Sequence, residues 1–333
     1  MSRRPDVDVV IALYRPGAWI DGCLESVRAQ RGVAVRTILV DDDPSSPLAA
    51  SLAARMPDAV AIGTTRNRGY AAANNAGIAA GDAPFVLCLN QDARLAPDYL
   101  ARLVALLRAS PRVGSASGKV LRVRSPAGRP DGTIDSAGLK MEAGRRAIDI
   151  GQGSLDDSQF DGQREVFGVS AAAALYRRTA LDAVSTAGEV FDESFFMYKE
   201  DVDLAWRMRR AGFDAWVDGE AVAYHGRSAA AAPPQTGINR LFALWAQERA
   251  KPKRIRRLSW RNQMLMIAKN ESSASIGAAL PRLMRMQILH ACADLLLDPV
   301  GGLANRLRLT FRIRRTIAER DRGFSVDLSR WLP

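Results

Sequence analysis

Three carboxylates stand at the start of a predicted helix, where they could exchange protons with a substrate or only cap the helix. Glu200, Asp201 and Asp203 follow the aromatic run that begins at Phe195, and apolar residues recur after them at helical spacing until Gly212. Carboxylates at a helix start satisfy free N–H groups and complement the helix dipole, so capping alone is the simpler explanation. Other polar clusters in the chain favour a chemical role.

Acidic and amide side chains also follow the ends of predicted strands. Asp41–Asp43 come after one buried run, Asn90–Asp92 come after another, and Asn67 lies in a turn between them. His225, one of only two histidines in the chain, ends a further predicted strand. Ligands of parallel α/β sheets bind beyond the carboxyl ends of the strands, so these residues are expected to converge at one edge.

The elements that must position these residues alternate between strands and helices. This alternation predicts a doubly wound, parallel α/β sheet. The predicted strands are Val7–Tyr14, Val35–Val40, Val60–Ile62, Phe85–Leu89, Val166–Tyr176 and Ala215–His225. The predicted helices, besides the one that carries Asp201, are Trp19–Gln30, Pro47–Met56, Ala71–Ala80 and Pro97–Ala109. Gly114–Gly162 has little periodicity and is interpreted as short strands and exposed loops.

The last third of the chain has a different composition. Residues 231–333 hold 19 Lys and Arg against 7 Asp and Glu, whereas the first 230 hold 28 and 29. Ala229–Gly237 is interpreted as a linker, which predicts an α/β domain over residues 1–230 and a basic, mainly helical region over 231–333. Leu280–Leu297 is a predicted apolar helix that could pack between subunits, and Arg306–Arg315 is left open between strand and helix.

Such a basic region has three interpretations. It could bind nucleic acid, lie on an anionic membrane surface, or cap the first domain as helices with one solvated face. The three cysteines, Cys23, Cys88 and Cys292, are far apart, so a zinc site is not expected. The polar start of the chain and the lack of a long apolar run predict a cytoplasmic protein.

The polar residues have the chemistry that transfer from a nucleotide sugar needs. Asp41 could accept a hydrogen bond from the imide N–H of a base. Asp92, with His225 as a second ligand, could hold a hard divalent cation that neutralises a leaving diphosphate. Asp201 could accept the proton of the attacking hydroxyl.

With these segments in place, the chain resembles the family 2 glycosyltransferases of the GT-A fold, in particular the bacterial rhamnosyltransferase-like branch. The resemblance covers roughly the first 230 residues and is carried by Val9–Arg15, Leu39–Ser45, Arg66–Gly77, Leu87–Leu95, Phe191–Gly212 and Ala223–Gly226. It implies a Rossmann-like, doubly wound sheet that binds a nucleotide-diphosphate sugar, deoxythymidine- or uridine-linked, with Mg²⁺ or Mn²⁺.

The resemblance also implies roles for single residues. By this resemblance, the residues that contact the nucleotide-sugar donor are Ala12, Tyr14, Asp41, Asn67, Gly69, Asn74, Asn90 and Gln91. The metal falls to Asp92, in the family's Asp-x-Asp position, and to His225, whereas Asp201 matches the general base of inverting enzymes. Three departures stand out: Asn90 replaces the first Asp of that motif, Arg15 replaces an Asn, and Asp42 with Asp43 makes the base pocket unusually acidic.

The expected function is inverting transfer of a sugar, such as rhamnose, to a hydroxyl of a polysaccharide or lipid-linked acceptor in cell-envelope synthesis. Beside such a domain, the membrane interpretation of the basic region is favoured over nucleic acid, with a peripheral location on the inner face of the membrane. A nucleotidyltransferase is the first alternative, although Tyr14–Gly17 has only one glycine where a phosphate loop would need more. An inactive nucleotide- or glycan-binding protein is the second, and Asn90 is the residue that suggests it.

Overall fold

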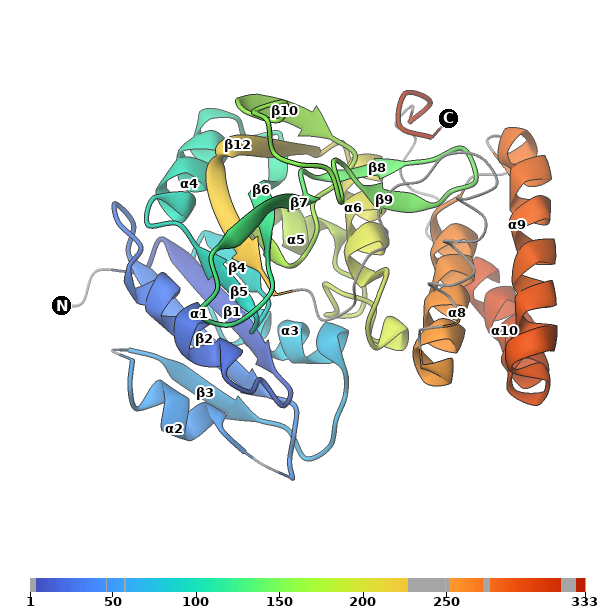
Figure 1. Ribbon diagram of the computed structural model, residues 1–333, viewed down its shortest axis with the longest axis horizontal. Helices are drawn as coiled ribbons and strands as arrows, with labels where there is room; N and C mark the ends of the chain where they lie inside the picture. The colour runs from blue at the N-terminus through green and yellow to red at the C-terminus, as the bar shows by residue number, and fades with distance from the viewer. Residues whose placement is uncertain are drawn as a thin grey trace.

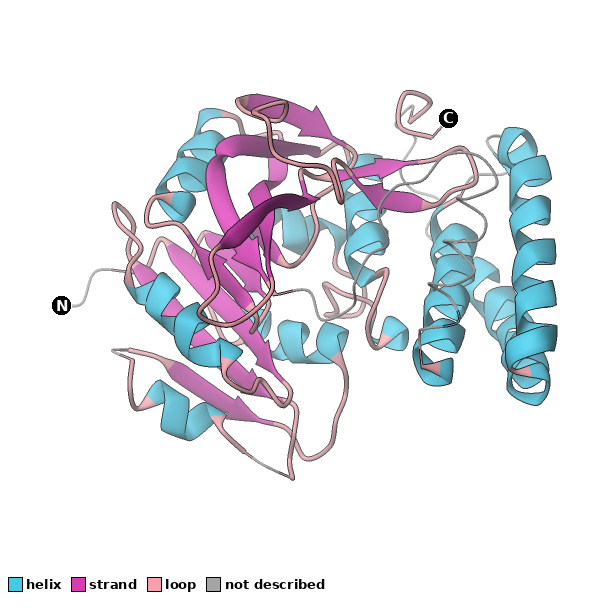
Figure 2. Ribbon diagram, in the orientation of Figure 1, coloured by secondary structure: helices cyan, strands magenta, loops and turns pink. Residues whose placement is uncertain are grey.

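A computed structural model describes residues 4–45, 47–56, 58–226, 249, 252–271, 276–318 and 328–332. One mixed sheet lies at the centre, and three long helices stand beyond one side of it (Figures 1 and 2). Along the sheet the strands follow the order β10 (Gln163–Val166), β12 (Asp214–His225), β6 (Val113–Val123), β11 (Ala173–Arg177), β4 (Phe85–Leu89), β1 (Val7–Leu13), β2 (Val35–Asp41) and β3 (Val60–Gly63). The predicted α/β fold with a helical C-terminal region is confirmed.

The parallel half of the sheet forms where the sequence has near-continuous apolar, β-branched runs. Such runs suit strands that are covered on both faces. Its strands are β1 (Val7–Leu13), β2 (Val35–Asp41), β3 (Val60–Gly63) and β4 (Phe85–Leu89). One face packs against α1 (Trp19–Arg28), α2 (Ala49–Ala53) and α4 (Tyr99–Ala109). The other packs against α3 (Tyr70–Ala79), α5 (Arg178–Val184) and α6 (Glu200–Arg210).

The sheet is not parallel throughout, and here the prediction was wrong. Strand β11 (Ala173–Arg177) inserts antiparallel between β4 and β6 (Val113–Val123). Ala174 pairs with Cys88 on one side and Ser117 on the other. Because direction is set by these long-range pairings, the alternation of strands and helices could not reveal it.

The predicted strand Val166–Tyr176 is two strands. β10 (Gln163–Val166) ends where the prediction began, and β11 starts at Ala173. Between them, the Arg209 guanidinium hydrogen-bonds the Val166 and Phe167 carbonyls, which diverts the chain from the sheet. The segment between the two strands contains a turn at Ala171, which contacts the carboxylate of Asp201.

The stretch Gly114–Gly162 is also more ordered than predicted. It holds the mostly buried β6, then β7 (Pro130–Ser136), β8 (Leu139–Met141) and β9 (Ala147–Asp149). β6 pairs in parallel with β12 (Asp214–His225), and β5 (Ala93–Leu95) pairs antiparallel with the end of β12. At Gly118 an added Cβ would collide with the Ala221 carbonyl oxygen, so the close approach of β12 requires glycine at this position of β6.

The C-terminal helices are α8 (Lys253–Asn270), α9 (Ile276–Leu297) and α10 (Pro299–Ala318), so the segment left open at Arg306–Arg315 is helical. Figure 1 shows α8 next to α6 and α9 at the far end of the molecule. Within the described ranges, no helix is both long and apolar enough to cross a bilayer. The predicted linker Ala229–Gly237 lies outside the described residues, and the division at residue 230 stays a prediction.

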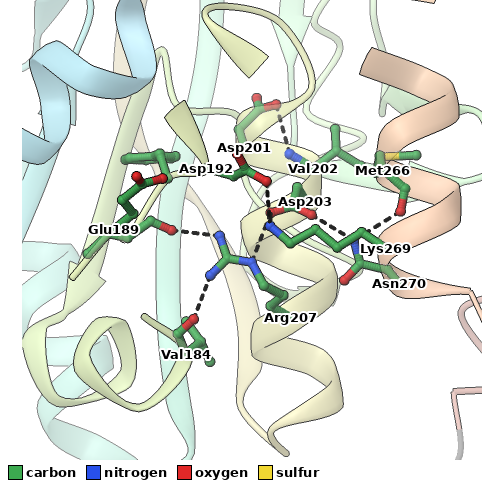
Figure 3. A network of polar contacts seen from close by, with 12 residues as sticks. Val184, Glu189, Asp192, Asp201, Val202, Asp203, Arg207, Met266, Lys269 and Asn270 are labelled. Atoms are coloured by element: carbon green, nitrogen blue, oxygen red, sulfur yellow. Dashed lines mark hydrogen bonds and ion pairs between the residues drawn. The ribbon is translucent and has the colours of Figure 1, made fainter. Parts of the chain in front are cut away.

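Helices α6 and α8 share an apolar cluster and a polar network. Phe195 and Trp206 pack in one cluster with Trp260 and Met266 of α8. A short 3₁₀ turn, η1 (Glu193–Phe195), precedes α6. Figure 3 shows Asp203 at the centre of the polar contacts that join the two helices. The helix that carries Asp201 is therefore held from the C-terminal region.

Candidate active site

The predicted site residues gather where parallel strands end. Leu13 is opposite Asp41 in the β1–β2 register, so Tyr14 and the Asp41–Asp43 run leave the sheet together. Gln91, just after β4, holds the Tyr14 backbone with two hydrogen bonds. Its side-chain oxygen accepts from the Tyr14 N–H (2.8 Å), and its side-chain amide donates to the Tyr14 carbonyl (2.9 Å). Tyr14 is 43% exposed, which leaves its ring open to a ligand. Ala12 lies half-buried at the end of β1.

Asp41 already holds the start of α2. Its Oδ2 accepts the N–H groups of Leu48 and Ala49, and its Oδ1 accepts that of Asp43 (3.1 Å). An ionised carboxylate has about four acceptor positions, so Oδ1 keeps room for one more donor such as a base N–H. The base-binding role of Asp41 stays a prediction.

The unusual acids next to Asp41 have partners within the protein. Asp43 Oδ2 lies 3.0 Å from Arg15 Nε, so two departures from the family pattern pair with each other. The Ser45 hydroxyl and then Arg15 lower the pKa of Asp43. Asp42 accepts the N–H groups of Arg68 (2.8 Å) and Gly69 (2.7 Å) and so shapes the predicted diphosphate turn. This role of Asp42 was not predicted, because it depends on contacts with backbone N–H groups 26 and 27 positions away.

The Asn67–Gly69 turn is tight on both sides. Asn67 Oδ1 accepts the Gly69 N–H (3.1 Å), and Gly69 has φ +88°. A Cβ at Gly69 would lie 2.5 Å from the Phe196 ring, so both conformation and space require glycine there. Asn74 is buried and donates its amide to the Tyr70 carbonyl (2.9 Å), so that amide is engaged within α3. Diphosphate contacts of Asn67, Gly69 and Asn74 stay predictions.

Asp92, between β4 and β5, and His225, at the end of β12, come together. Asp92 Oδ1 lies 3.3 Å from His225 Nε2, and Asn90 Nδ2 lies 3.2 Å from the same nitrogen. His225 Nδ1 lies 2.8 Å from Asp135 Oδ2. Burial disfavours the charged ring, but the hydrogen bonds with Asp135 and Asp92 prevail and raise the pKa of His225 to about 9.

This arrangement fits a divalent cation. Two oxygen or nitrogen ligands at about 2.1 Å from one ion lie roughly 3 Å apart, as Asp92 Oδ1 and His225 Nε2 do. Asp135 can accept the Nδ1 proton, as a common outer partner of metal-bound histidine does. With a pKa of about 9 the free ring also carries a proton on Nε2, which a cation would have to displace before Nε2 could bind it. Within the described residues no group of three or more His, Cys, Asp or Glu side chains is poised for a metal, so a bound diphosphate would have to supply further oxygens.

Asp135 is a site residue that the sequence did not single out. It lies 90 positions from His225, on β7, within the stretch interpreted as short strands and loops. A polar residue in a weakly periodic segment gives no signal of such a distant partner.

Asp201 lies in the first turn of α6, and its carboxylate accepts hydrogen bonds from backbone N–H groups. Its Oδ1 accepts the Val202 N–H (2.8 Å) and its Oδ2 accepts the Ala171 N–H at 3.4 Å. The next residue, Ala172, accepts the Asn90 N–H (2.9 Å). The turn at Ala171 therefore joins the Asp201 carboxylate to the segment that carries Asp92.

Glu200, which is buried, and Asp201, which is half-buried, are adjacent acids with different surroundings. Burial, and then the neighbouring Asp201 charge, raise the pKa of Glu200 to about 8, and its Oε2 has no partner among the described residues. Burial also raises the pKa of Asp201, but Lys199 and backbone N–H groups oppose the rise. Three backbone N–H groups favour the charged form of Asp201, against one at Glu200.

An open α/β sheet with acidic and amide side chains gathered at its strand ends is the arrangement of GT-A-fold proteins, which bind nucleotide-diphosphate sugars. Residues 8–184 match the family described as Glycosyl transferase family 2. The chain belongs to this family.

Curated relatives agree with the family and its rhamnosyltransferase-like branch. An N-acetylglucosaminyl-diphospho-decaprenol L-rhamnosyltransferase of Mycobacterium tuberculosis (strain H37Rv) is 28% identical over 246 residues, 65% of this chain and 75% of that protein. Succinoglycan biosynthesis protein ExoO of Rhizobium meliloti is 37% identical over 106 residues. The match to ExoO spans only 31% of this chain and 30% of that protein.

Solved structures support the fold. GalNAc-T7, determined with UDP, GalNAc and Mn²⁺, has a TM-score of 0.56 at 12% identity over 83% of this chain and 58% of that one. TarS of S. aureus has a TM-score of 0.50 at 11% identity over 97% of this chain and 56% of that one. At these identities the likeness concerns the fold alone.

Proposed function

We propose that the protein is an inverting, metal-dependent glycosyltransferase that uses a nucleotide-diphosphate sugar. The observation that carries the proposal is the turn at Ala171 and Ala172. It binds the Asp201 carboxylate on one side and the Asn90 N–H on the other, so the base and the cation-binding segment share one support.

In the proposed reaction the acceptor hydroxyl attacks the anomeric carbon from the side opposite the diphosphate. The new carbon–oxygen bond forms as the bond to the diphosphate oxygen breaks, and the configuration inverts. Asp201 takes the hydroxyl proton, and the N–H groups of Ala171 and Val202 favour the charged carboxylate that this role needs. The nucleoside diphosphate leaves with the bonding electron pair.

Asp92 and His225 would hold Mg²⁺ or Mn²⁺. Such an ion, when bound, neutralises charge that develops on the leaving diphosphate. Asp135 orients His225, and Asn90 lies beside the same ring nitrogen. The Asn90 replacement therefore keeps a polar group next to the cation ligands, although it contributes no charge.

The donor would lie along the strand ends. Asp41 would accept the base N–H, Ala12 and Tyr14 would contact the nucleoside, and Gln91 keeps the Tyr14 backbone in place. Asn67, Gly69 and Asn74 would shape the diphosphate pocket. A uridine or deoxythymidine diphosphate sugar suits a carboxylate acceptor, and the mycobacterial relative's name suggests rhamnose as the sugar and a lipid-linked diphosphate as the acceptor.

A surface on α9 and α10 favours a second part of the proposal, peripheral binding to an anionic membrane. Ile276, Leu280, Met284 and Ile288 recur every four residues on α9, so they share one exposed face. Leu295 and Leu296 (71% each) and Val300 (82%) continue it. We call these seven residues the apolar stripe, and Figure 1 shows α9 at the end of the molecule away from α1 and α2.

The positive charge of α9 and α10 favours a membrane, rather than a second copy of the chain, as the partner that covers the apolar stripe. Four exposed arginines, Arg282, Arg285, Arg308 and Arg312, lie on the same two helices. The described acids there, Asp294 and Asp298, already bind Arg306 and Arg257. Anionic lipid headgroups complement these arginines, whereas the described acids of a second copy are already paired and offer them no partner. We therefore expect membrane binding rather than the homo-oligomer considered from the sequence.

The test is a screen of uridine and deoxythymidine diphosphate sugars by thermal shift and by product release, each with and without Mn²⁺. The proposal expects one donor to raise the melting temperature more with Mn²⁺ and to be slowly hydrolysed without acceptor. Stabilisation by a donor that is never hydrolysed or transferred would instead favour an inactive binding protein. No stabilisation by any sugar nucleotide would refute the donor class.

A further inference from the structure

The loop that leads into α6 has an unusual backbone. Phe196, Tyr198 and Lys199 all have positive φ, at 65°, 70° and 73°. Residues with side chains rarely adopt this region, and they do so where surrounding structure holds them. Asp201 follows directly, and the Asp203 N–H donates to the Lys199 carbonyl (2.9 Å). The loop therefore sets where the first turn of α6 begins.

A single buried side chain from α8 holds this loop. The Asn262 amide nitrogen lies 2.8 Å from each of the carbonyl oxygens of Phe195, Met197 and Tyr198. Asn262 has 0% exposure, so water does not compete for these carbonyls. The two amide hydrogens must be shared among three acceptors that otherwise diverge along the strained turn.

The orientation of the Asn262 amide is fixed by its surroundings. Its oxygen accepts from Arg261 Nε (3.0 Å) and Nη2 (2.9 Å), which can only donate. The same Arg261 Nη2 donates to the Ser194 carbonyl (2.9 Å). The nitrogen of Asn262 must therefore face the loop.

The loop touches the predicted diphosphate turn on its opposite side. The Phe196 carbonyl accepts the Ala71 N–H (3.2 Å), and the Phe196 ring packs against Gly69. One loop thus lies between the Gly69 turn and α8 and leads into the Asp201 helix. Loss of the α8 contact would free one side of the loop and leave the Gly69 contact in place.

We propose that Asn262 is a positioning residue for catalysis: through the carbonyls of Phe195, Met197 and Tyr198 it fixes the placement of Asp201. The inference rests on the proposed role of Asp201. It assigns to the C-terminal region a part in the reaction itself, in addition to the surface on α9 and α10.

The test compares Asn262→Ala and the milder Asn262→Ser with Asn270→Ala. Asn270 is a matched control, because it is a buried amide on the same helix and does not bind the loop. Its partner Asp203 keeps Lys269 and Arg207 when the Asn270 amide is lost, so α6 stays held. For each variant we would measure kcat, the Kd of the nucleoside diphosphate, the melting temperature and amide hydrogen exchange.

We expect Asn262→Ala to lower kcat about 10²-fold, the effect of roughly 1 Å of misplacement, and to change Kd less than about threefold. Asn262→Ser should lie between it and the wild type, and Asn270→Ala should keep kcat within about threefold at a similar loss of melting temperature. Exchange should accelerate at Ala71 and across residues 196–203 in the Asn262 variants alone.

Equal losses of kcat in Asn262→Ala and Asn270→Ala would overturn the proposal, as would a loosened loop with unchanged kcat. Failure of both Asn262 variants to fold, beside a folded Asn270→Ala, would assign Asn262 to stability alone. Hydrogen exchange needs no reaction, so a failure of the Asp201 base role would show as wild-type turnover in Asp201→Asn and leave the exchange result intact.

Discussion

The ammonium of Lys269 on α8 lies 3.0 Å from the carboxylate of Asp203 on α6 (Nζ to Oδ2) and joins the two helices in the interior (Figure 3). Asp203 is fully buried and also binds Arg207 (2.8 Å) and Asn270 (2.7 Å). Lys269 reaches Asp192 as well (3.0 Å). A buried charge with several partners is costly to break from one side, so this contact ties the C-terminal region to the helix of Asp201.

The first prediction concerns acid stability. Burial disfavours the Asp203 charge, but Lys269 and then Arg207 prevail and lower its pKa to about 2. A depressed carboxyl pKa stabilises the folded state above the unfolded value of about 3.9, and this stabilisation is lost as pH falls from about 4 toward about 2. The ionised group should contribute about 2 kcal/mol at neutral pH.

Urea unfolding at several pH values would measure this contribution. Asp203→Asn should unfold much more easily than the wild type at pH near 7, and the difference should shrink as pH falls toward about 3. Asp182→Asn, an exposed acid on α5, serves as the control and should change little. A difference between Asp203→Asn and the wild type that does not depend on pH would contradict the prediction.

Glu200 should show the opposite sign. Its pKa is raised to about 8, so between about 4.5 and 8 the folded state keeps a proton that the unfolded state has lost. Stability therefore falls as pH rises through this window. Glu200→Gln should be more stable than the wild type by up to about 3 kcal/mol near pH 7 and should show no gain near pH 4. Calorimetry at both pH values tests it, and a variant less stable at both would contradict it.

Cation binding should depend on Asp92 and, more weakly, on Asp135. Titration calorimetry of Mn²⁺ in the presence of nucleoside diphosphate should show more than about 10²-fold weaker binding in Asp92→Ala and roughly 10-fold weaker binding in Asp135→Asn, which loses only the orientation of His225. Asp131→Asn is the control, because Asp131 is exposed on the same strand and pairs with Arg124 (2.7 Å). Wild-type affinity in Asp92→Ala would remove the metal site from this account.

Membrane binding should depend on the apolar stripe and on charge. Vesicles of phosphatidylcholine with roughly a third phosphatidylglycerol should sediment the wild type, whereas neutral vesicles or high salt should do so weakly. Leu295→Glu combined with Leu296→Glu should abolish sedimentation without loss of turnover on a soluble acceptor. The contrary result would be a wild type that does not bind anionic vesicles and is dimeric by light scattering, with the dimer lost when these two leucines are replaced. It would show that a second copy of the chain covers the apolar stripe.

Elements with strong periodicity could be predicted from the sequence. Strand pairings and side-chain contacts between residues far apart in the chain could not. The apolar runs from Val7 and from Phe85 and the helix from Glu200 lie where they were predicted. The direction of β11 was missed because it depends on pairing with Cys88 and Ser117, far away in the chain.

The same limit applies to the candidate site. Asp92 and His225 were placed together from the family pattern, and their side chains do meet. Asp135 and Asn262 were missed, since each acts through a partner more than 60 positions away and neither lies in a recognisable motif. Asp41, expected to be free for a base, uses most of its acceptor positions on α2, because one carboxylate can serve a helix start and a ligand at once.

The proposed mechanism is tested most directly by two measurements on Asp201→Asn: turnover of the donor identified in the screen, and the Kd of its nucleoside diphosphate with Mn²⁺. We expect turnover to fall at least about 10³-fold while the Kd stays within about threefold of the wild type, because the side chain keeps its shape and loses only the ability to take a proton. Wild-type turnover by Asp201→Asn would contradict the central claim that this carboxylate is the base.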